Sequence, residues 1–385
     1  MNYEITGNYS IDHASNKTDL KPFFILILSI IFIPAAYVFV AAVFIVQFIK
    51  GNLVINTKNK LSILIYAFIS IGLISSNYKI ISTLYAIIMI LCYYSFQIIS
   101  KLHSSSLKKL KKLILVMSII VFIFGIMQYF NPQFSMPSKW VDANEYNLKR
   151  RIYSTFFNPN VFGFYINFII LLACENLDFK KINLEWAVFG SGIICLILTF
   201  SRTAWISLIV ALLTASLFNK KYLKYAIIIS ITIFSADTLL GVGRADPLKA
   251  VEDSSFLYRL EVWKVSFDII KDNFISGIGF GTLFKHVPDY SSVVSTRIEH
   301  SHNLYIQIFT ETGILGFSIF IILLYNVLKK FHRRLYENNN KIWITAFTVL
   351  TMTMIHGLVD SVSLTPQILM ILSIYAGTLN SIEYI

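Results

Sequence analysis

The length of the apolar blocks is the feature that most constrains this chain. Residues 23–48 run for twenty-six positions without a charged side chain, and residues 113–130 run for eighteen. About 20 residues of α-helix cross the hydrocarbon of a bilayer, so blocks of this length predict membrane spans. Similar or shorter blocks recur at 61–75, 80–99, 161–174, 186–200, 203–218, 225–240, 303–327, 342–359 and 362–379. The sequence therefore predicts an all-α, polytopic membrane bundle of eleven or twelve transmembrane helices.

Composition agrees with a single integral membrane domain over 1–385. Hydrophobic residues make up 56% of the chain and charged residues 14%, against roughly 25% charged in soluble domains. The first block is longer than the roughly 7–15 apolar residues of a signal peptide, and no small-residue cleavage site follows it. The net charge of +12 resides in loops between spans, so it predicts topology and not nucleic-acid binding. The three cysteines lie inside apolar blocks and predict buried thiols.

The positive-inside rule, by which short cytoplasmic loops carry more Lys and Arg, predicts the orientation. Eighteen basic residues lie in alternate loops at 49–60, 100–112, 175–185, 219–224 and 328–341. Six lie in the other short loops at 76–79, 131–151, 201–202 and 360–361. The first set and the carboxyl terminus are predicted to be cytoplasmic. The amino terminus is outside if 23–48 crosses once, and inside if a hairpin breaks this block near Pro34.

Two large segments, 131–160 and 242–301, are then extracytoplasmic. The second contains an amphipathic helix that is predicted to lie on the membrane surface or to cap the spans. Its apolar stripe is formed by Phe256, Leu260, Trp263, Phe267 and Ile270, and its polar face by Glu261, Lys264, Asp268 and Lys271.

Several arginines lie on the predicted outer side, where the positive-inside rule disfavours them, and three of them stand at positions of interest. Arg151 precedes a span, Arg202 stands in a short turn between two spans, and Arg259 lies beside the apolar stripe. An arginine at the hydrocarbon edge is costly unless it meets an anion, and its guanidinium binds a phosphate through two hydrogen bonds. These three are candidate ligands for a phosphate-bearing substrate. The plainer interpretation is contact with lipid headgroups, or pairing with carboxylates such as Asp237 or Glu252.

His302 is the candidate general base, at the outer start of the span that begins with Asn303. Histidine titrates near neutrality and can accept a proton from a hydroxyl group. The plainer interpretation is a polar anchor at the membrane interface. If His302 is not the base, His300 and Glu299 are the nearest candidates.

The same span contains Glu311, Gly313 and Gly316. Glu311 lies about 13 Å along the helix from His302, on nearly the opposite side, so a packing or hydrogen-bonding role is predicted for it. The two glycines predict close approach of a neighbouring helix. The glycine-rich stretch 277–281 lacks nucleotide-binding spacing and predicts a turn. No Asp-x-Asp pair occurs, so neither a catalytic metal nor a cofactor is expected.

These motifs resemble the O-antigen ligase and polymerase superfamily of bacterial envelopes. Its pattern is matched by His302-Asn303, nine intervening residues, and Gly313-x-x-Gly316. The other marks occur in the family's order and cover an O-antigen ligase-like core at roughly 150–320. They are Arg151 ahead of Thr155-Phe156-Phe157-Asn158-Pro159-Asn160, Ser201-Arg202-Thr203-Ala204, Arg259 with Trp263, and Gly277-Ile278-Gly279-Phe280-Gly281.

The resemblance implies a C-type glycosyltransferase architecture of about twelve helices in the bacterial inner (cytoplasmic) membrane, with both termini cytoplasmic and the active site facing outside. It implies a donor glycan on undecaprenyl diphosphate, transferred without a metal to an acceptor glycan or to lipid A core. Further expected partners are the lipid bilayer, a chain-length regulator and a flippase, and no nucleic acid. The arginines would stabilise the leaving diphosphate, and His302 would deprotonate the acceptor hydroxyl, which inverts the anomeric carbon.

Within this superfamily the sequence favours a polymerase over a ligase. Ligases often carry a leucine four residues after the arginine of the turn, where this chain has Ile206. A ligase that transfers the glycan to lipid A core or another final acceptor is the alternative. A polysaccharide flippase or transporter would instead place charges deep within several spans or show repeat symmetry. A purely structural membrane subunit would not need the ordered motifs.

Overall fold

The computed structural model describes residues 20–51, 59–134, 150–178, 180–246, 253–294, 298, 300–338 and 340–383. Within these ranges the chain forms fourteen α-helices, three 3-10 turns and no strand, which confirms the all-α prediction. Glu252 and Glu299 lie outside the described residues. The helices are α1 (Lys21–Ile31), α2 (Ile33–Ile49), α3 (Lys60–Ile74), α4 (Lys79–Ile99), α5 (Ser104–Phe130), α7 (Pro159–Cys174), α8 (Leu184–Thr199), α9 (Arg202–Ser216), α10 (Lys221–Leu240), α12 (Ser254–Asp272), α13 (Leu283–Tyr290), α14 (Leu304–Asn338), α15 (Lys341–Gly357) and α16 (Pro366–Glu383).

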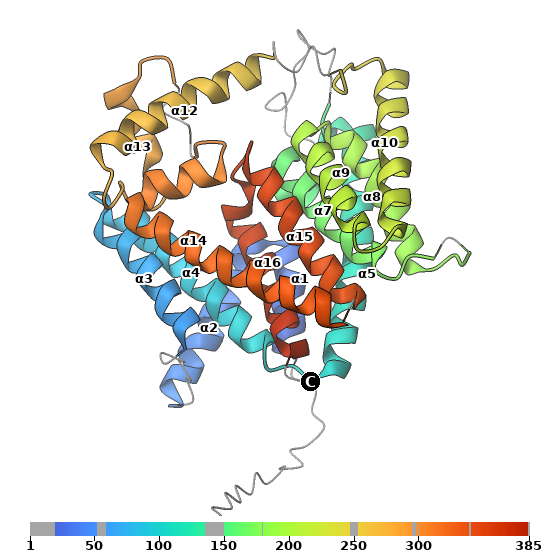
Figure 1. Cartoon of the computed structure of the whole chain (residues 1–385), viewed down its shortest axis with the longest axis horizontal. Coiled ribbons are helices and arrows are strands. Elements are labelled where there is room, and N and C mark those ends of the chain that lie inside the picture. The colour runs from blue at the N-terminus through green and yellow to red at the C-terminus, as the bar shows by residue number, and fades with distance from the viewer. Residues whose placement is uncertain are drawn as a thin grey trace, which may run out of the picture.

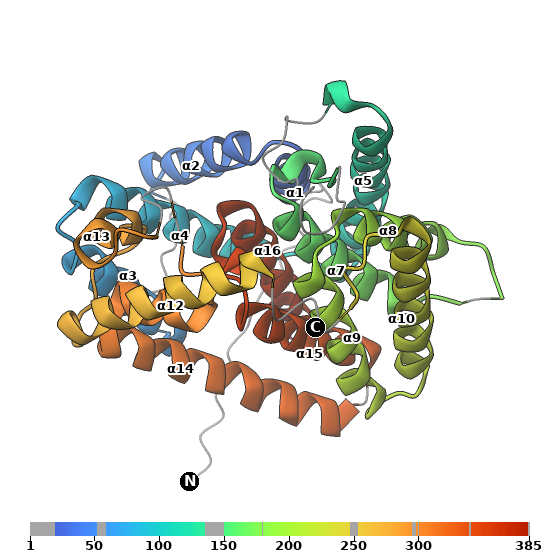
Figure 2. The ribbon, with the colours of Figure 1, turned by 90° about the horizontal axis from the view of Figure 1, so that it is seen from above.

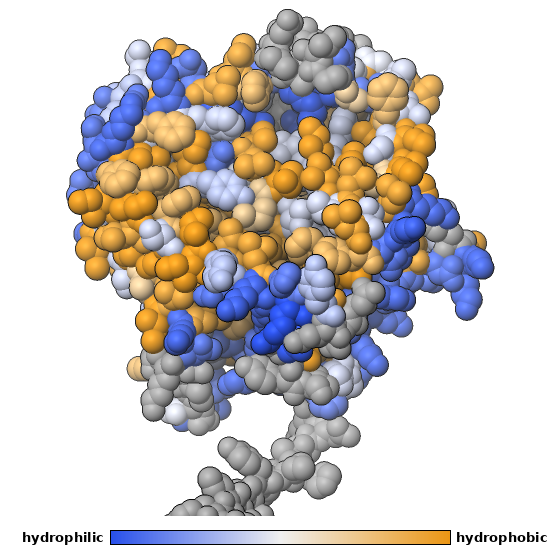
Figure 3. All heavy atoms as spheres, in the orientation of Figure 1, coloured by the Kyte–Doolittle hydropathy of each residue, from blue (hydrophilic) through white to orange (hydrophobic). Residues whose placement is uncertain are grey.

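The apolar blocks correspond to helices of a membrane-spanning bundle (Figure 1). Four helices are long and apolar enough to cross a membrane, namely Lys79–Ile99, Ser104–Phe130, Lys221–Leu240 and Leu304–Tyr336, and seven shorter helices are also apolar. The block 23–48 is broken at Phe32, which leaves the helical region between α1 and α2, and Pro34 stands in the first turn of α2. Figure 3 shows apolar side chains in a broad band across the visible face of the molecule, with polar residues above and below this band.

Contacts between loops divide the bundle into two ends. At one end the guanidinium of Arg151, ahead of α7, donates to the Thr199 carbonyl at the end of α8. At the other end Lys111 of α5 forms a 2.7 Å ion pair with Glu175, which follows α7. Lys221, at the start of α10, also donates to the Glu175 carbonyl. The charge-count loops at 100–112, 175–185 and 219–224 thus meet at one end, and Arg151 lies against the end of α8, next to the 201–202 turn.

The helix α12 forms as predicted, and part of its predicted apolar stripe is exposed, while Ile270 of that stripe and a second apolar face are buried. Leu260 and Phe267 of that stripe are 40% and 49% exposed. The buried face contains Val262, Val265 and Ile269, which pack in one cluster with residues of the following loop and α13. The reason is that α12 is apolar on two faces, and the compact branched side chains form the contact with the rest of this segment. Seen from above in Figure 2, α12 runs across the bundle alongside α14.

Gly313 breaks the helix α14, and the close approach that was predicted there is made by the segment after α12 and not by a neighbouring helix. Gly313 has φ 58° and ψ −166°, a conformation that residues with a Cβ rarely adopt. A Cβ there would clash with the Ile275 backbone, so the residue that approaches Gly313 belongs to the segment after α12 and not to another span. A Cβ on Gly316 would meet the side chain of Thr312 in its own helix. The predicted turn at 277–281 exists, with positive φ at Gly277, among others.

Candidate functional site

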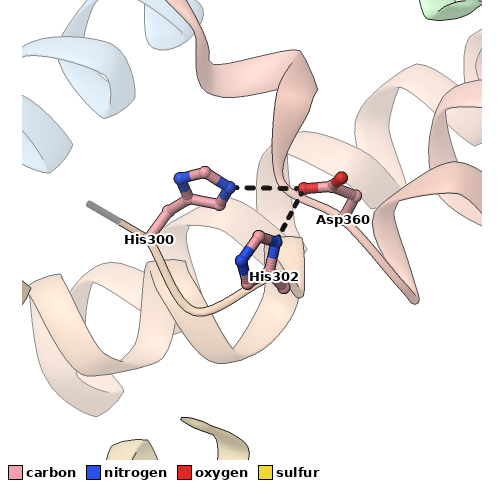
Figure 4. A group of neighbouring side chains, drawn as sticks. All are labelled: His300, His302 and Asp360. Atoms are coloured by element: carbon pink, nitrogen blue, oxygen red, sulfur yellow. Dashed lines mark hydrogen bonds and ion pairs between the residues drawn. The ribbon is translucent and has the colours of Figure 1, made fainter. Parts of the chain in front are cut away.

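A buried carboxylate, that of Asp360, connects the candidate site residues. It lies in the turn between α15 and the 3-10 turn η3 (Val362–Leu364) and is 2% exposed. Its Oδ1 is 3.4 Å from Nδ1 of His302 and 3.4 Å from Nε2 of His300, as Figure 4 shows. Its Oδ2 accepts a 3.0 Å hydrogen bond from Asn160. Two imidazoles and one amide therefore share one carboxylate.

The pKa shifts favour an ionised Asp360 beside a neutral His302. Burial opposes ionisation of Asp360, but the hydrogen bonds from His300 and His302 and the charge of Arg259 outweigh it and hold the pKa of Asp360 well below its usual range. Burial also disfavours the charged form of His302. It lowers the pKa of His302 below 6.5, although Asp360 acts in the opposite direction. His302 is thus neutral at neutral pH and able to accept a proton.

Local structure holds His302 at the entrance to α14. Its φ is 52°, in the left-handed region that only a few per cent of non-glycine residues occupy. The side-chain oxygen of Asn303 accepts hydrogen bonds from the amides of Tyr305 and Ile306, which caps the helix. The Asn303 amide nitrogen donates to the Leu358 carbonyl at 2.8 Å. Asn303 therefore joins the start of α14 to the end of α15, beside Asp360.

Arg151 is held by a carbonyl and an amide side chain. Its Nε donates to Thr199 O at 2.7 Å, and its Nη2 donates to Asn160 Oδ1 at 3.1 Å. Burial, together with the charges of Arg244, Arg259 and Arg202, lowers the pKa of Arg151 to about 9. The four guanidinium groups therefore repel one another in a poorly solvated place, and an anion bound among them would relieve this repulsion.

Arg202 and Arg259 approach carboxylates. Arg202 Nη2 forms a 2.7 Å ion pair with Asp253, which also caps α12 by accepting from the Phe256 amide. Arg259 Nη2 is 3.9 Å from Asp360 Oδ2, a longer contact. The pairing interpretation is therefore realised for Arg202, whose partner here is Asp253. Asp237 instead accepts hydrogen bonds from backbone amides, including that of Arg244.

The sequence did not single out Asp360 or Arg244. Arg244 is 8% exposed and lies in the short segment after α10, where its Nη1 approaches the Phe200 carbonyl at 3.5 Å. Both residues carried a usable signal, because each is a charged side chain in a connection between apolar blocks on the predicted outer side. His300, the alternative base, lies against His302, with ring centroids 4.4 Å apart.

Glu311 lies deeper than His302 and takes the hydrogen-bonding role that was predicted for it. Its Oε1 accepts from the Gly281 amide at 2.6 Å and from Gln307 Nε2 at 2.7 Å. Its side chain is therefore directed to the 277–281 turn. Gly313 and Gly316 shape α14 and do not contribute side chains to the site.

One group of described residues could hold a metal ion. The ligand atoms of His300, His302 and Asp360 lie within 4.8 Å of one another. Asp360, however, already accepts hydrogen bonds at both oxygens, and the guanidinium of Arg259 is nearby. A neighbouring cation opposes the binding of a second cation. The expectation that the chain uses no catalytic metal stays a prediction.

A bundle of apolar helices with clustered arginines and a histidine–carboxylate pair at one end defines the class: an integral membrane protein with a cluster of charged side chains at one end of its helices. Residues 187–321 match the family model described as O-antigen ligase, from α8 to the middle of α14. This match supports the resemblance to the O-antigen ligase and polymerase superfamily over this part of the chain. Arg151 and Asp360 lie outside the matched range. The comparisons found no match to the chain among curated proteins or solved structures.

Proposed function

We propose that this protein is an extracytoplasmic membrane glycosyltransferase that polymerises undecaprenyl-diphosphate-linked oligosaccharide repeat units into a surface polysaccharide, such as O-antigen, capsule or exopolysaccharide. The observation that supports this most directly is the proximity of Arg259, one of four clustered arginines, to Asp360, the carboxylate that contacts His302. Such a transfer needs cations that stabilise the leaving diphosphate and a base that deprotonates the attacking hydroxyl.

The arginines serve the donor. No nucleotide sugar is supplied outside the cytoplasm, so the donor must already be activated, and a lipid diphosphate is such a donor. Negative charge grows on the diphosphate as the bond from the anomeric carbon to the phosphate oxygen breaks. Cations already in place stabilise that charge in the transition state. Arg202 and Arg259 have this role, with Arg151 in support.

His302 and Asp360 serve the acceptor. With Nδ1 of His302 facing Asp360 at 3.4 Å, the proton of the neutral ring is placed on Nδ1, and Nε2 is left to accept. The acceptor hydroxyl gives its proton to Nε2, and its oxygen forms the new bond to the anomeric carbon from the side opposite the diphosphate. The configuration at that carbon is inverted. Asp360 stays ionised and stabilises the imidazolium that forms.

The proposed setting is the bacterial inner membrane, with the site facing outside and both termini cytoplasmic. The loops at the end of the bundle opposite the site carry the excess of basic residues, which supports this orientation. The acceptor is proposed to be another lipid-linked glycan. Ile206 is 57% exposed on α9, so this preference for a polymerase rests on the resemblance and not on a contact in the site.

The experiment that tests this function is reconstitution. The purified protein is incubated in detergent with undecaprenyl-diphosphate-linked repeat units, in EDTA, and products are resolved by length. We expect glycans of two or more repeat units that remain attached to undecaprenyl diphosphate. Transfer only when lipid A core is added would identify a ligase. No transfer to either acceptor, with flipping of the donor in vesicles, would replace the proposal with a transporter.

A further inference from the structure

A continuous chain of buried hydrogen bonds runs from the 277–281 turn to the residue before His302. The Gly281 amide donates to Glu311 Oε1 at 2.6 Å, and Gln307 Nε2 donates to the same oxygen at 2.7 Å. Oε1 of Gln307 then accepts from the Ser301 amide at 2.6 Å. Glu311, Gln307 and Ser301 are 6%, 3% and 0% exposed. Water therefore does not compete for these bonds.

The turn at the far end of this chain is anchored to other helices. Ser82 of α4 donates to the Phe280 carbonyl at 2.9 Å, and the Phe280 amide donates to the Gly72 carbonyl of α3 at 3.2 Å. The Gly279 amide donates to the backbone carbonyl of Glu311 at 2.8 Å. Because side chains would collide at these approaches, the turn is rich in glycine. The chain of hydrogen bonds thus rests on a fixed support from α3 and α4.

We propose that Glu311 and Gln307 are positioning residues, which fix the Ser301 backbone and so hold His302 against Asp360. This inference rests on the proposed role of His302 as the base. His302 needs such support because its left-handed backbone conformation is intrinsically disfavoured and must be imposed by its neighbours. The Ser301 hydroxyl also donates to the Asn303 carbonyl at 2.9 Å, so the two residues on either side of His302 are joined by a hydrogen bond.

Substitutions at Gln307 and Glu311 separate positioning from mere packing. Gln307→Leu removes both of its side-chain bonds and is expected to lower kcat about 100-fold, the cost of a small misplacement of a catalytic group, with KM for the donor nearly unchanged. Glu311→Leu should behave similarly. Glu311→Gln is expected to lose less than Glu311→Leu, because both bonds go to one oxygen and an amide oxygen can accept two. Thr312→Val, a buried neighbour bonded only within its helix, is the matched control.

An exchange of the two side chains provides a rescue. Gln307→Glu alone places two carboxylates face to face, and we expect low kcat. Combined with Glu311→Gln, the new amide can turn its nitrogen toward residue 307 and donate to the new carboxylate, while the carboxylate accepts from Ser301. The bond between residues 307 and 311 and the bond from Ser301 can then both form. The double variant should therefore recover much of the kcat that Gln307→Glu loses.

The position of His302 can also be tested without measuring turnover. Diethyl pyrocarbonate modifies exposed histidines, and mass spectrometry gives the modification rate of each one. In the wild type, His302 should react more slowly than the exposed His103, because its side chain is 23% exposed. Gln307→Leu should speed the modification of His302 and leave that of His103 unchanged. If the wild type transfers no sugar but this pattern holds, the proposed function fails and the positioning role stands. Unchanged His302 modification in both leucine variants, or no rescue in the exchange, would overturn the proposal.

Discussion

The amide of Asn160 links the arginine cluster to the candidate base. Its nitrogen donates to Oδ2 of Asp360 at 3.0 Å, across 200 positions of sequence. Its oxygen accepts from Nη2 of Arg151 at 3.1 Å and from Ser201 Oγ at 3.0 Å. One side chain at the start of α7 thus connects the cationic part of the site to the part that contacts His302. The residues proposed to bind the sugar donor and those proposed to activate the sugar acceptor are therefore held in one hydrogen-bond network. A glycosyl transfer requires this, because the new bond forms as the old one breaks.

Asp360→Asn tests the carboxylate in this network. The amide keeps the shape of the side chain but no longer stabilises an imidazolium. It also offers a donor where His302 needs an acceptor for Nδ1–H. We expect kcat to fall by about 10²–10⁴-fold, the usual contribution of general-base catalysis. Asp268→Asn, at a carboxylate that pairs only with Lys271 on the surface of α12, is the matched control. Turnover of Asp360→Asn at the control's rate would exclude Asp360 from the site chemistry.

Arg202→Lys and Arg259→Lys test the diphosphate site. Lysine keeps the charge but does not present two parallel N–H groups to a phosphate, so each variant should lose activity at saturating acceptor. Arg202→Lys should also weaken the contact between α9 and α12, because Arg202 Nη2 and the Asp253 carboxylate are 2.7 Å apart in an ion pair that joins them. Arg150→Lys serves as control, because Arg150 is exposed and donates to the Tyr129 carbonyl. Wild-type chain lengths and rates in both site variants would favour contact with lipid headgroups instead.

The sequence predicted the apolar helices and the 277–281 turn, and it offered the break near Pro34 as one of two alternatives, because hydropathy and local backbone preference act over short distances. It did not predict that Asp360 contacts His302, since that contact depends on how α15 packs against α14 and not on any spacing along the chain. The face that α12 buries within the protein was not predicted, for a similar reason. Two apolar faces are visible in its sequence, and only the tertiary packing of Val262 and Val265 selects one of them.

The pH dependence follows from the pKa of His302, which burial lowers below 6.5. The neutral form is the active base, so activity should persist as the pH falls from 8 to 6.5 and decline only below that value. The groups that face His302 are His300, Asp360 and Arg259. Asp360→Asn removes the charge that raises the pKa of His302, so any residual activity should decline at a still lower pH. A wild-type decline centred above 6.5 would contradict a buried, neutral His302.

Orientation is tested by cysteine labelling in intact cells. Ser292→Cys lies at the site end and Lys101→Cys at the other end, both at exposed positions. The three native cysteines are buried, so background labelling should be low. An impermeant thiol reagent should label residue 292 and spare residue 101 until the membrane is permeabilised. The reverse pattern would place the site in the cytoplasm, where the reaction would meet a different pool of donors.

The specific activity of purified His302→Ala is the most direct test of the account. Its yield and its elution as a folded protein in detergent are measured separately from its rate with undecaprenyl-diphosphate-linked repeat units. Because the ring that accepts the proton is gone, we expect transfer to fall by about 10²–10⁴-fold while the protein still inserts and folds. A polar anchor at the interface would instead lower the yield and leave the rate per molecule intact. Full specific activity in His302→Ala would contradict the mechanism, and the base would then be sought at His300.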